Sequence, residues 1–167
     1  MSYKITIPFT PLAKASVRLG KNGYYNPSFN NMAITKSYVV RHLKHNYDNF
    51  KLLKGPLLVI AHFMLPAPIS KTLKFRVLRN FLPHIKKPDG DNLEKFLNDS
   101  LKGVIWEDDA RIAWLLRSKN YTCNKKGRTI LFVRELQNCA PDFDLILNDI
   151  EENINFMDEG DKDEFAE

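Results

Sequence analysis

The chain of 167 residues has few features that would anchor a protein in a membrane or cross-link it in an oxidising compartment. Its two cysteines, Cys123 and Cys139, do not form a CxxC motif, which argues against a disulfide framework or cysteine-bound structural zinc. The longest apolar run, from Pro56 to Pro66, is too short to span a bilayer. The N-terminus has the pattern of a strand rather than that of a signal peptide. We therefore expect a cytoplasmic protein with no membrane-spanning segment.

Acidic residues are scarce through most of the sequence. Residues 1–134 contain 24 Lys and Arg but only eight Asp and Glu, a net charge of +16. Residues 135–167 contain one base and twelve acids, a net charge of −11, so the formal total of +5 averages two unlike parts. A body this basic indicates a polyanionic partner, either nucleic acid or an anionic membrane surface.

Apolar periodicity predicts that strands and helices alternate along the basic part. The expected strands cover residues 3–9, 57–65, 104–106, 112–121 and 129–136. The expected helices cover residues 32–47, 69–81 and 91–101. A long basic loop is expected over residues 10–30, and a basic hairpin at residues 125–128 is expected to join the last two strands. The pattern favours an α/β or α+β fold with a mixed sheet of about four to five strands and two to three helices.

The acidic C-terminal part is expected to form a tail on this single domain. We place the domain at residues 1–136 and the tail at residues 137–167. Apolar residues recur at helical spacing between Phe143 and Ile154, which predicts an amphipathic helix over residues 142–157, with disorder after it. One hypothesis for the tail is that it competes with DNA for the basic surface.

Seven of the eight acids in the basic part lie within one window of 21 residues. They are Asp89, Asp91, Glu94, Asp99, Glu107, Asp108 and Asp109. Carboxylates repel phosphate, so acids concentrated in a DNA-binding surface require a reason. Hard cations such as Mg²⁺ supply one, because they bind through one or two carboxylates together with substrate phosphate. In phosphodiester cleavage such an ion polarises a phosphoryl oxygen, generates hydroxide and stabilises the leaving oxygen.

The spacing of these acids is compatible with a metal site. Asp89 and Asp91 are two residues apart at the mouth of an expected helix, whose N-terminus also favours phosphate. A purely structural interpretation also exists: Asp91 could form a capping box with Glu94 and an ion pair with Lys95, and Asp108 could mark only a turn. We favour the metal site because acids are so rare elsewhere in the basic part.

Aromatic residues in the long basic loop have two alternative interpretations. Tyr24, Tyr25 and Phe29 could stack on unpaired bases, or they could pack the loop onto the body of the domain. Both remain open from the sequence. Among the histidines, His62 lies in an apolar strand and is expected to be a core residue, whereas His84 lies just before the acidic window.

Three motifs in the acidic window occur in an order and at a spacing that resemble a known family. They are Lys87-Pro88-Asp89-Gly90-Asp91-Asn92-Leu93-Glu94-Lys95, then Asp99-Ser100-Leu101, then Trp106-Glu107-Asp108-Asp109-Ala110. The sequence resembles the RusA-type Holliday junction resolvases, and the wider pattern covers about residues 3–136. Two positions depart from the family pattern. Arg111 stands where glutamine is common, and Gly90 stands where a larger apolar residue is common.

The resemblance implies a homodimeric, Mg²⁺-dependent, structure-selective endonuclease that resolves four-way DNA junctions by paired phosphodiester hydrolysis, in recombination and repair. Mn²⁺ would be able to replace Mg²⁺. Asp89, Asp91 and Asp109 would be the metal ligands, Lys95 the catalytic lysine, and Asp99 and Asp108 supporting residues. The DNA-binding residues would be Lys14, Arg18, Lys86, Lys87 and Lys119. The alternatives are a non-catalytic DNA-binding protein on the same fold, or a metal-dependent nuclease for flaps, duplexes or RNA.

Overall fold

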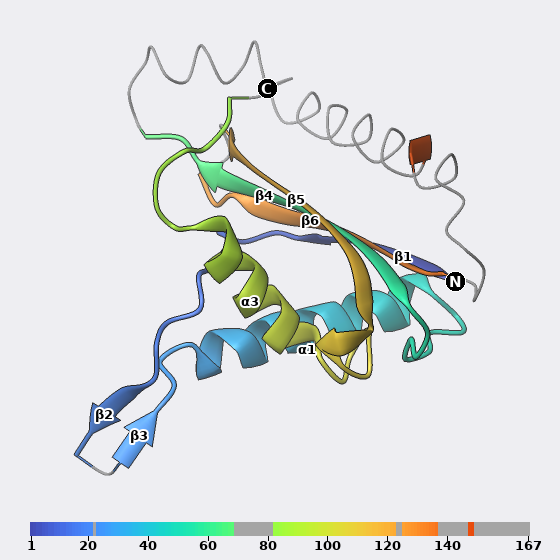
Figure 1. Cartoon of the computed structure of the whole chain (residues 1–167), viewed down its shortest axis with the longest axis horizontal. Coiled ribbons are helices and arrows are strands. Elements are labelled where there is room, and N and C mark those ends of the chain that lie inside the picture. The colour runs from blue at the N-terminus through green and yellow to red at the C-terminus, as the bar shows by residue number, and fades with distance from the viewer. Residues whose placement is uncertain (22, 69–81, 123–124, 137–146, 149–167) are drawn as a thin grey trace.

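The chain folds into a four-stranded mixed sheet with two helices on one of its faces and a separate two-stranded ribbon (Figure 1). The computed structural model describes residues 1–21, 23–68, 82–122, 125–136 and 147–148. The main sheet consists of β1 (Ser2–Ile7), β4 (Leu57–Pro66), β5 (Ile112–Thr122) and β6 (Arg128–Glu135). The ribbon consists of β2 (Arg18–Gly20) and β3 (Gly23–Tyr25), and the helices are α1 (Phe29–Asn46) and α3 (Gly90–Leu101). The expected α+β class with a mixed sheet is confirmed.

The order of strands in the main sheet is β1-β6-β4-β5, which places β4 in an interior position. Nine of its ten residues are buried. It pairs in parallel with β5 and antiparallel with β6. A continuous apolar run with no polar alternation requires cover on both faces, and an interior strand provides the place for it.

The predicted hairpin between β5 and β6 is wrong, because β4 lies between these two strands. The half-exposed pattern of β5 fits an edge strand. More apolar surface is buried when β4, rather than β5, takes the interior position. A turn does lead into β6, and Gly127 is required there. Its φ is +62°, and a Cβ atom at this position would approach the carbonyl oxygen of Met64 to 2.6 Å.

Other expected elements differ in detail. Residues 104–106 do not form a strand; Trp106 makes only isolated bridges, to Leu53 and Lys102. The expected loop at residues 10–30 contains the β2–β3 ribbon, and the first helix begins at Phe29 rather than at residue 32. The basic helix expected at residues 69–81 lies outside the described residues. So does most of the tail, of which only residues 147 and 148 are described, as helical.

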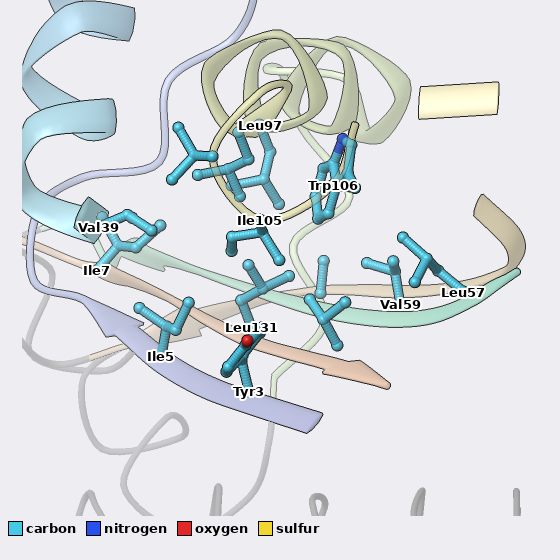
Figure 2. Packing of buried hydrophobic residues seen from close by; sticks show 14 of the residues in the cluster. Tyr3, Ile5, Ile7, Val39, Leu57, Val59, Leu97, Ile105, Trp106 and Leu131 are labelled. Atoms are coloured by element: carbon cyan, nitrogen blue, oxygen red, sulfur yellow. The ribbon is translucent and has the colours of Figure 1, made fainter. Parts of the chain in front are cut away.

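The core lies between the main sheet and the two helices, as Figure 2 shows. Residues of β1, β4 and β6, such as Ile5, Val59 and Leu131, meet Leu97 of α3 and the segment that follows this helix. Trp106 in that segment is fully buried. The backbone of Leu53 holds the segment from both sides, since its N–H donates to Ile105 and its carbonyl accepts from Glu107. This anchoring fixes the acidic turn that comes next.

In the part of the chain that the structure describes, no helix has the length and apolar character needed to cross a membrane.

Candidate active site

The start of α3 presents two of the predicted metal ligands to solvent. Asp89 is the N-cap residue and has an extended backbone (φ −72°, ψ 144°), but its side chain makes no capping hydrogen bond. Asp91 lies in the first turn, so it is not the N-cap residue of a capping box with Glu94. The capping box that the structural interpretation assigned to Asp91 and Glu94 is therefore wrong. Both carboxylates lie at a helix N-terminus, where the backbone dipole favours negative charge.

Lys95, the predicted catalytic lysine, forms the expected ion pair one helical turn after Asp91. Its ammonium lies 3.2 Å from Asp91 Oδ2, and the two side chains are 59% and 50% exposed. The hydrogen bond from Lys95 lowers the pKa of Asp91 from its ordinary value. The ionised form of Asp91 is therefore favoured. The side chain that pairs with it, Lys95, is exposed to solvent and can move.

The other predicted ligand, Asp109, lies after the C-terminal end of α3. Lys102 contacts the carboxylate of Asp108 and lies 3.5 Å from Asp109 Oδ1. The hydrogen bond from Lys102 holds the pKa of Asp108 well below its usual range, helped by the N–H of Ala110, and that of Lys102 is raised in turn. Asp109 begins the short 3₁₀ helix η1 (Asp109–Arg111).

Lys14 attaches the basic segment before the ribbon to the start of α3 and to its last turn. Its ammonium contacts the carboxylate of Asp99, and its backbone N–H donates to the carbonyl of Asn92 at 2.9 Å. Asp99, predicted to support the site, is thereby tied to a predicted DNA-binding residue. Arg18 lies further along, exposed on β2. The ribbon consequently projects from a base that is fixed beside the candidate site (Figure 1).

The aromatic residues of the ribbon region do not pack onto the body of the domain. Tyr24 is 80% exposed, Tyr25 is 50% exposed, and Phe29 at the start of α1 is 68% exposed. The packing alternative is therefore wrong for these side chains. Stacking on bases stays a prediction.

Two cations of β5 contact α3 or the segment that leads into it, and the sequence predicted neither contact. Arg117 pairs with Glu94 and lies close over Gly90, where an added Cβ would be 3.3 Å from Arg117 Nε. Lys119 donates to two backbone carbonyls in the segment before Asp89. Lys86 and Lys87, the remaining predicted DNA-binding residues, are exposed in that same segment.

Among the described residues, no group of three or more His, Cys, Asp or Glu lies close enough together to hold a metal ion. Asp89 and Asp91 lie at the start of α3 and Asp109 lies past its end, and a helix of 12 residues is about 18 Å long. An open cleft of about 440 Å³ lies between α3 and the beginning of β5. It is lined by Glu94, Asn98, Asp109, Ala110, Ile112, Ala113 and Leu115.

The donor chemistry at the start of α3 nevertheless fits Mg²⁺. This ion prefers oxygen ligands and retains several waters, so it commonly uses one or two carboxylates plus substrate phosphate. Asp89 and Asp91 supply two exposed carboxylates within three residues, next to a helix N-terminus that also favours phosphate. A cluster of three acids is thus not required for an ion to bind together with DNA.

Comparison with known proteins identifies one family. The model of the family described as endodeoxyribonuclease RusA matches residues 8–134, which is most of the chain. The match spans the ribbon, both helices, the acidic window and β4 to β6 almost to its end. It confirms the resemblance inferred from the three motifs. A search of curated proteins found no match.

Proposed function

Because the chain belongs to the endodeoxyribonuclease RusA family, we propose that it is a Mg²⁺-dependent endonuclease that resolves Holliday junctions by paired cuts and acts as a homodimer. Family membership supports the coarser statement, a nuclease that acts on branched DNA in recombination. The observation that carries the finer proposal is the exposed pair Asp89 and Asp91 at the start of α3. These acids persist in a region of net charge +16, where phosphate binding alone would disfavour them.

Asp89 and Asp91 would hold the ion, and Asp109, the third ligand that the resemblance implies, lines the cleft between α3 and the beginning of β5. When bound, Mg²⁺ would supply polarisation of the phosphoryl oxygen, activation of water and stabilisation of the leaving oxygen. The N-terminus of α3 would orient the scissile phosphate, because its unpaired N–H groups and dipole attract an anion. Each residue then acts from the end of an element that the core fixes in place.

Lys95 would balance the negative charge that develops on the phosphate. Its ammonium is one turn into α3 and 3.2 Å from Asp91, and its side chain is 59% exposed. It can therefore leave Asp91 and contact a phosphate oxygen that lies beside the same carboxylates. Positively charged groups aimed at a transferring phosphoryl group are a general means of stabilising such transition states.

Branched DNA would be held by the basic residues around this site and by the ribbon. Arg18 and the aromatic side chains of β3 project together from a base that Lys14 fixes to α3. Cations contact the phosphate backbone in any duplex, whereas exposed aromatic rings stack on bases that are unpaired or unstacked. A branch point provides such bases. A two-fold dimer would present two such sites to the two opposed strands of a junction.

The Asp91→Asn variant tests whether the protein is a nuclease or only a DNA-binding protein. We expect cleavage of a four-way junction in Mg²⁺ to be lost, while junction binding in EDTA persists, because one ligand is removed and the basic surface is unchanged. Glu107→Gln is the matched control: it changes an acid of the same window that pairs with Arg111 and has no assigned role in the site. We expect this control to cleave normally.

Cleavage by Asp91→Asn at the wild-type rate would show that the metal assignment is wrong. No cleavage by the wild-type protein, with intact junction binding, would favour a DNA-binding protein on this fold. A side-by-side digest of a four-way junction, a linear duplex, a flap and an RNA duplex tests the substrate. A rate on the junction no higher than on the other three would overturn the assignment of a resolvase.

A further inference from the structure

The segment that leads to Asp89 runs along the outer edge of β5. The N–H of His84 donates to the carbonyl of Lys119 at 2.8 Å, and the N–H of Tyr121 donates to the carbonyl of Leu82 at 2.9 Å. The ring of His84 packs on that of Tyr121, with centroids 4.5 Å apart. β5 is an edge strand of the four-stranded sheet, so its free edge is available for this pairing. The first half of the segment is thereby fixed to the sheet.

The second half of the segment is held by the side chain of Lys119. Lys119 Nζ donates to the carbonyl of Lys86 and to the carbonyl of Pro88, both at 2.7 Å. The side chain of Lys119 is half-buried, in contrast to the exposed side chains of Lys86 and Lys87. Two of the three ammonium donors therefore bind backbone carbonyls, and hydrogen bonds from a charged donor are among the stronger ones.

One of these two carbonyls lies directly before Asp89 in the chain. The carbonyl of Pro88 belongs to the peptide that joins Pro88 to Asp89, so the ammonium fixes the peptide next to a proposed metal ligand. Lys119 itself is fixed by β5, where it pairs in register with Phe63 of the interior strand β4. The contacts of Lys119 thereby connect the backbone next to Asp89 to the core of the sheet.

We propose that Lys119 is a positioning residue that holds the peptide before Asp89, so that this carboxylate meets a divalent ion and the scissile phosphate in a fixed orientation. This inference rests on the proposed function, in which Asp89 is a metal ligand. It gives Lys119 a role different from the phosphate contact that the sequence resemblance implies. Partners that orient a metal ligand typically contribute about 10- to 100-fold to metal affinity or activity.

The Lys119→Met variant tests the proposal, because methionine keeps much of the aliphatic length and removes the donors. We expect calorimetry to show Mn²⁺ binding weakened by about tenfold. Junction affinity in EDTA and its salt dependence should stay unchanged. Lys87→Met is the matched control in the same segment; there we expect weaker junction binding and a smaller salt slope, with Mn²⁺ affinity unchanged.

A fall in junction affinity and in salt slope in Lys119→Met, with Mn²⁺ binding unchanged, would show that Lys119 contacts phosphate and would overturn the proposal. Hydrogen exchange separates this failure from a failure of the proposed function. Even if the wild-type protein binds no divalent ion, the amides of residues 84–87 and of Asp89 should exchange faster in Lys119→Met than in the wild type, while those of β4 and β6 should not change. Unchanged exchange in residues 84–89 would overturn the positioning role itself.

Discussion

The buried histidine of β4 makes the stability of the fold depend on pH. His62 is 1% exposed, and its Nδ1 contacts the hydroxyl of Ser118. Burial, together with the charge of Arg128, lowers the pKa of His62 from 6.5 to about 4. The unfolded chain takes up a proton at this residue below pH 6.5, whereas the folded chain does so only near pH 4. The stability due to neutral His62 is therefore complete above pH 6.5 and falls as the pH drops to 4.

The size of this effect follows from the pKa difference. A difference of about 2.5 units corresponds to about 3 kcal/mol of unfolding free energy below pH 4. At pH 5, where the unfolded state is protonated and the folded state is mostly not, the loss is about 2 kcal/mol. Domains of this size typically have a total stability of about 5–15 kcal/mol, so a loss of this size is readily measured.

The His62→Gln variant isolates this contribution, because glutamine can still bond to Ser118 and does not titrate. We expect urea unfolding to show that the wild type loses about 2 kcal/mol more than the variant between pH 8 and pH 5. The absolute stability of the variant is not the test, since the substitution itself changes packing. Other groups titrate in both proteins and cancel in the comparison. Equal losses in the two proteins would refute the argument that His62 is buried in its neutral form.

Two further predictions concern the candidate site and the ribbon. The Lys102→Met variant removes the ammonium that lies near Asp109. We expect its cleavage to reach half the maximal rate at a severalfold lower Mg²⁺ concentration. A higher Mg²⁺ concentration at half-maximal rate would show that Lys102 assists the site. In Tyr24→Ala, an 80% exposed ring is removed; we expect a Tm close to that of the wild type, and about tenfold weaker binding to a junction with unchanged binding to a linear duplex. Equal weakening on both DNAs would exclude a contact specific to the branch point.

The sequence predicted those elements whose periodicity is decided locally. The alternation in β1, the apolar run of β4 and the apolar face of α3 each reflect a single surface that must be buried, so their bounds agree with the structure to within a few residues. The predicted hairpin pairing of the last two strands was wrong. Which strand lies beside β5 depends on the burial of β4, and this cannot be read from the turn between β5 and β6.

The charge pairs of the candidate site also divide into those set by local spacing and those set by the tertiary fold. The pair Asp91–Lys95 follows from helical spacing and was predicted. The cations that bind Glu94 and Asp99 are 23 and 85 residues away, on β5 and before the ribbon, so only the tertiary fold brings them to α3. The sequence identified the acids and the local partner Lys95, but it could not identify the distant bases that pair with Glu94 and Asp99.

These ion pairs bear directly on where a divalent ion would bind. Six of the seven acids in the window lie within 4 Å of a lysine or arginine; they are Asp91, Glu94, Asp99, Glu107, Asp108 and Asp109. Among the described residues, no such partner contacts Asp89. A carboxylate without a counter-charge gains most from an added cation, whereas each paired acid must first give up a base. Under the proposed function, an ion would therefore bind first at Asp89, and the orientation that we propose Lys119 gives to this carboxylate would become a geometric requirement of the site.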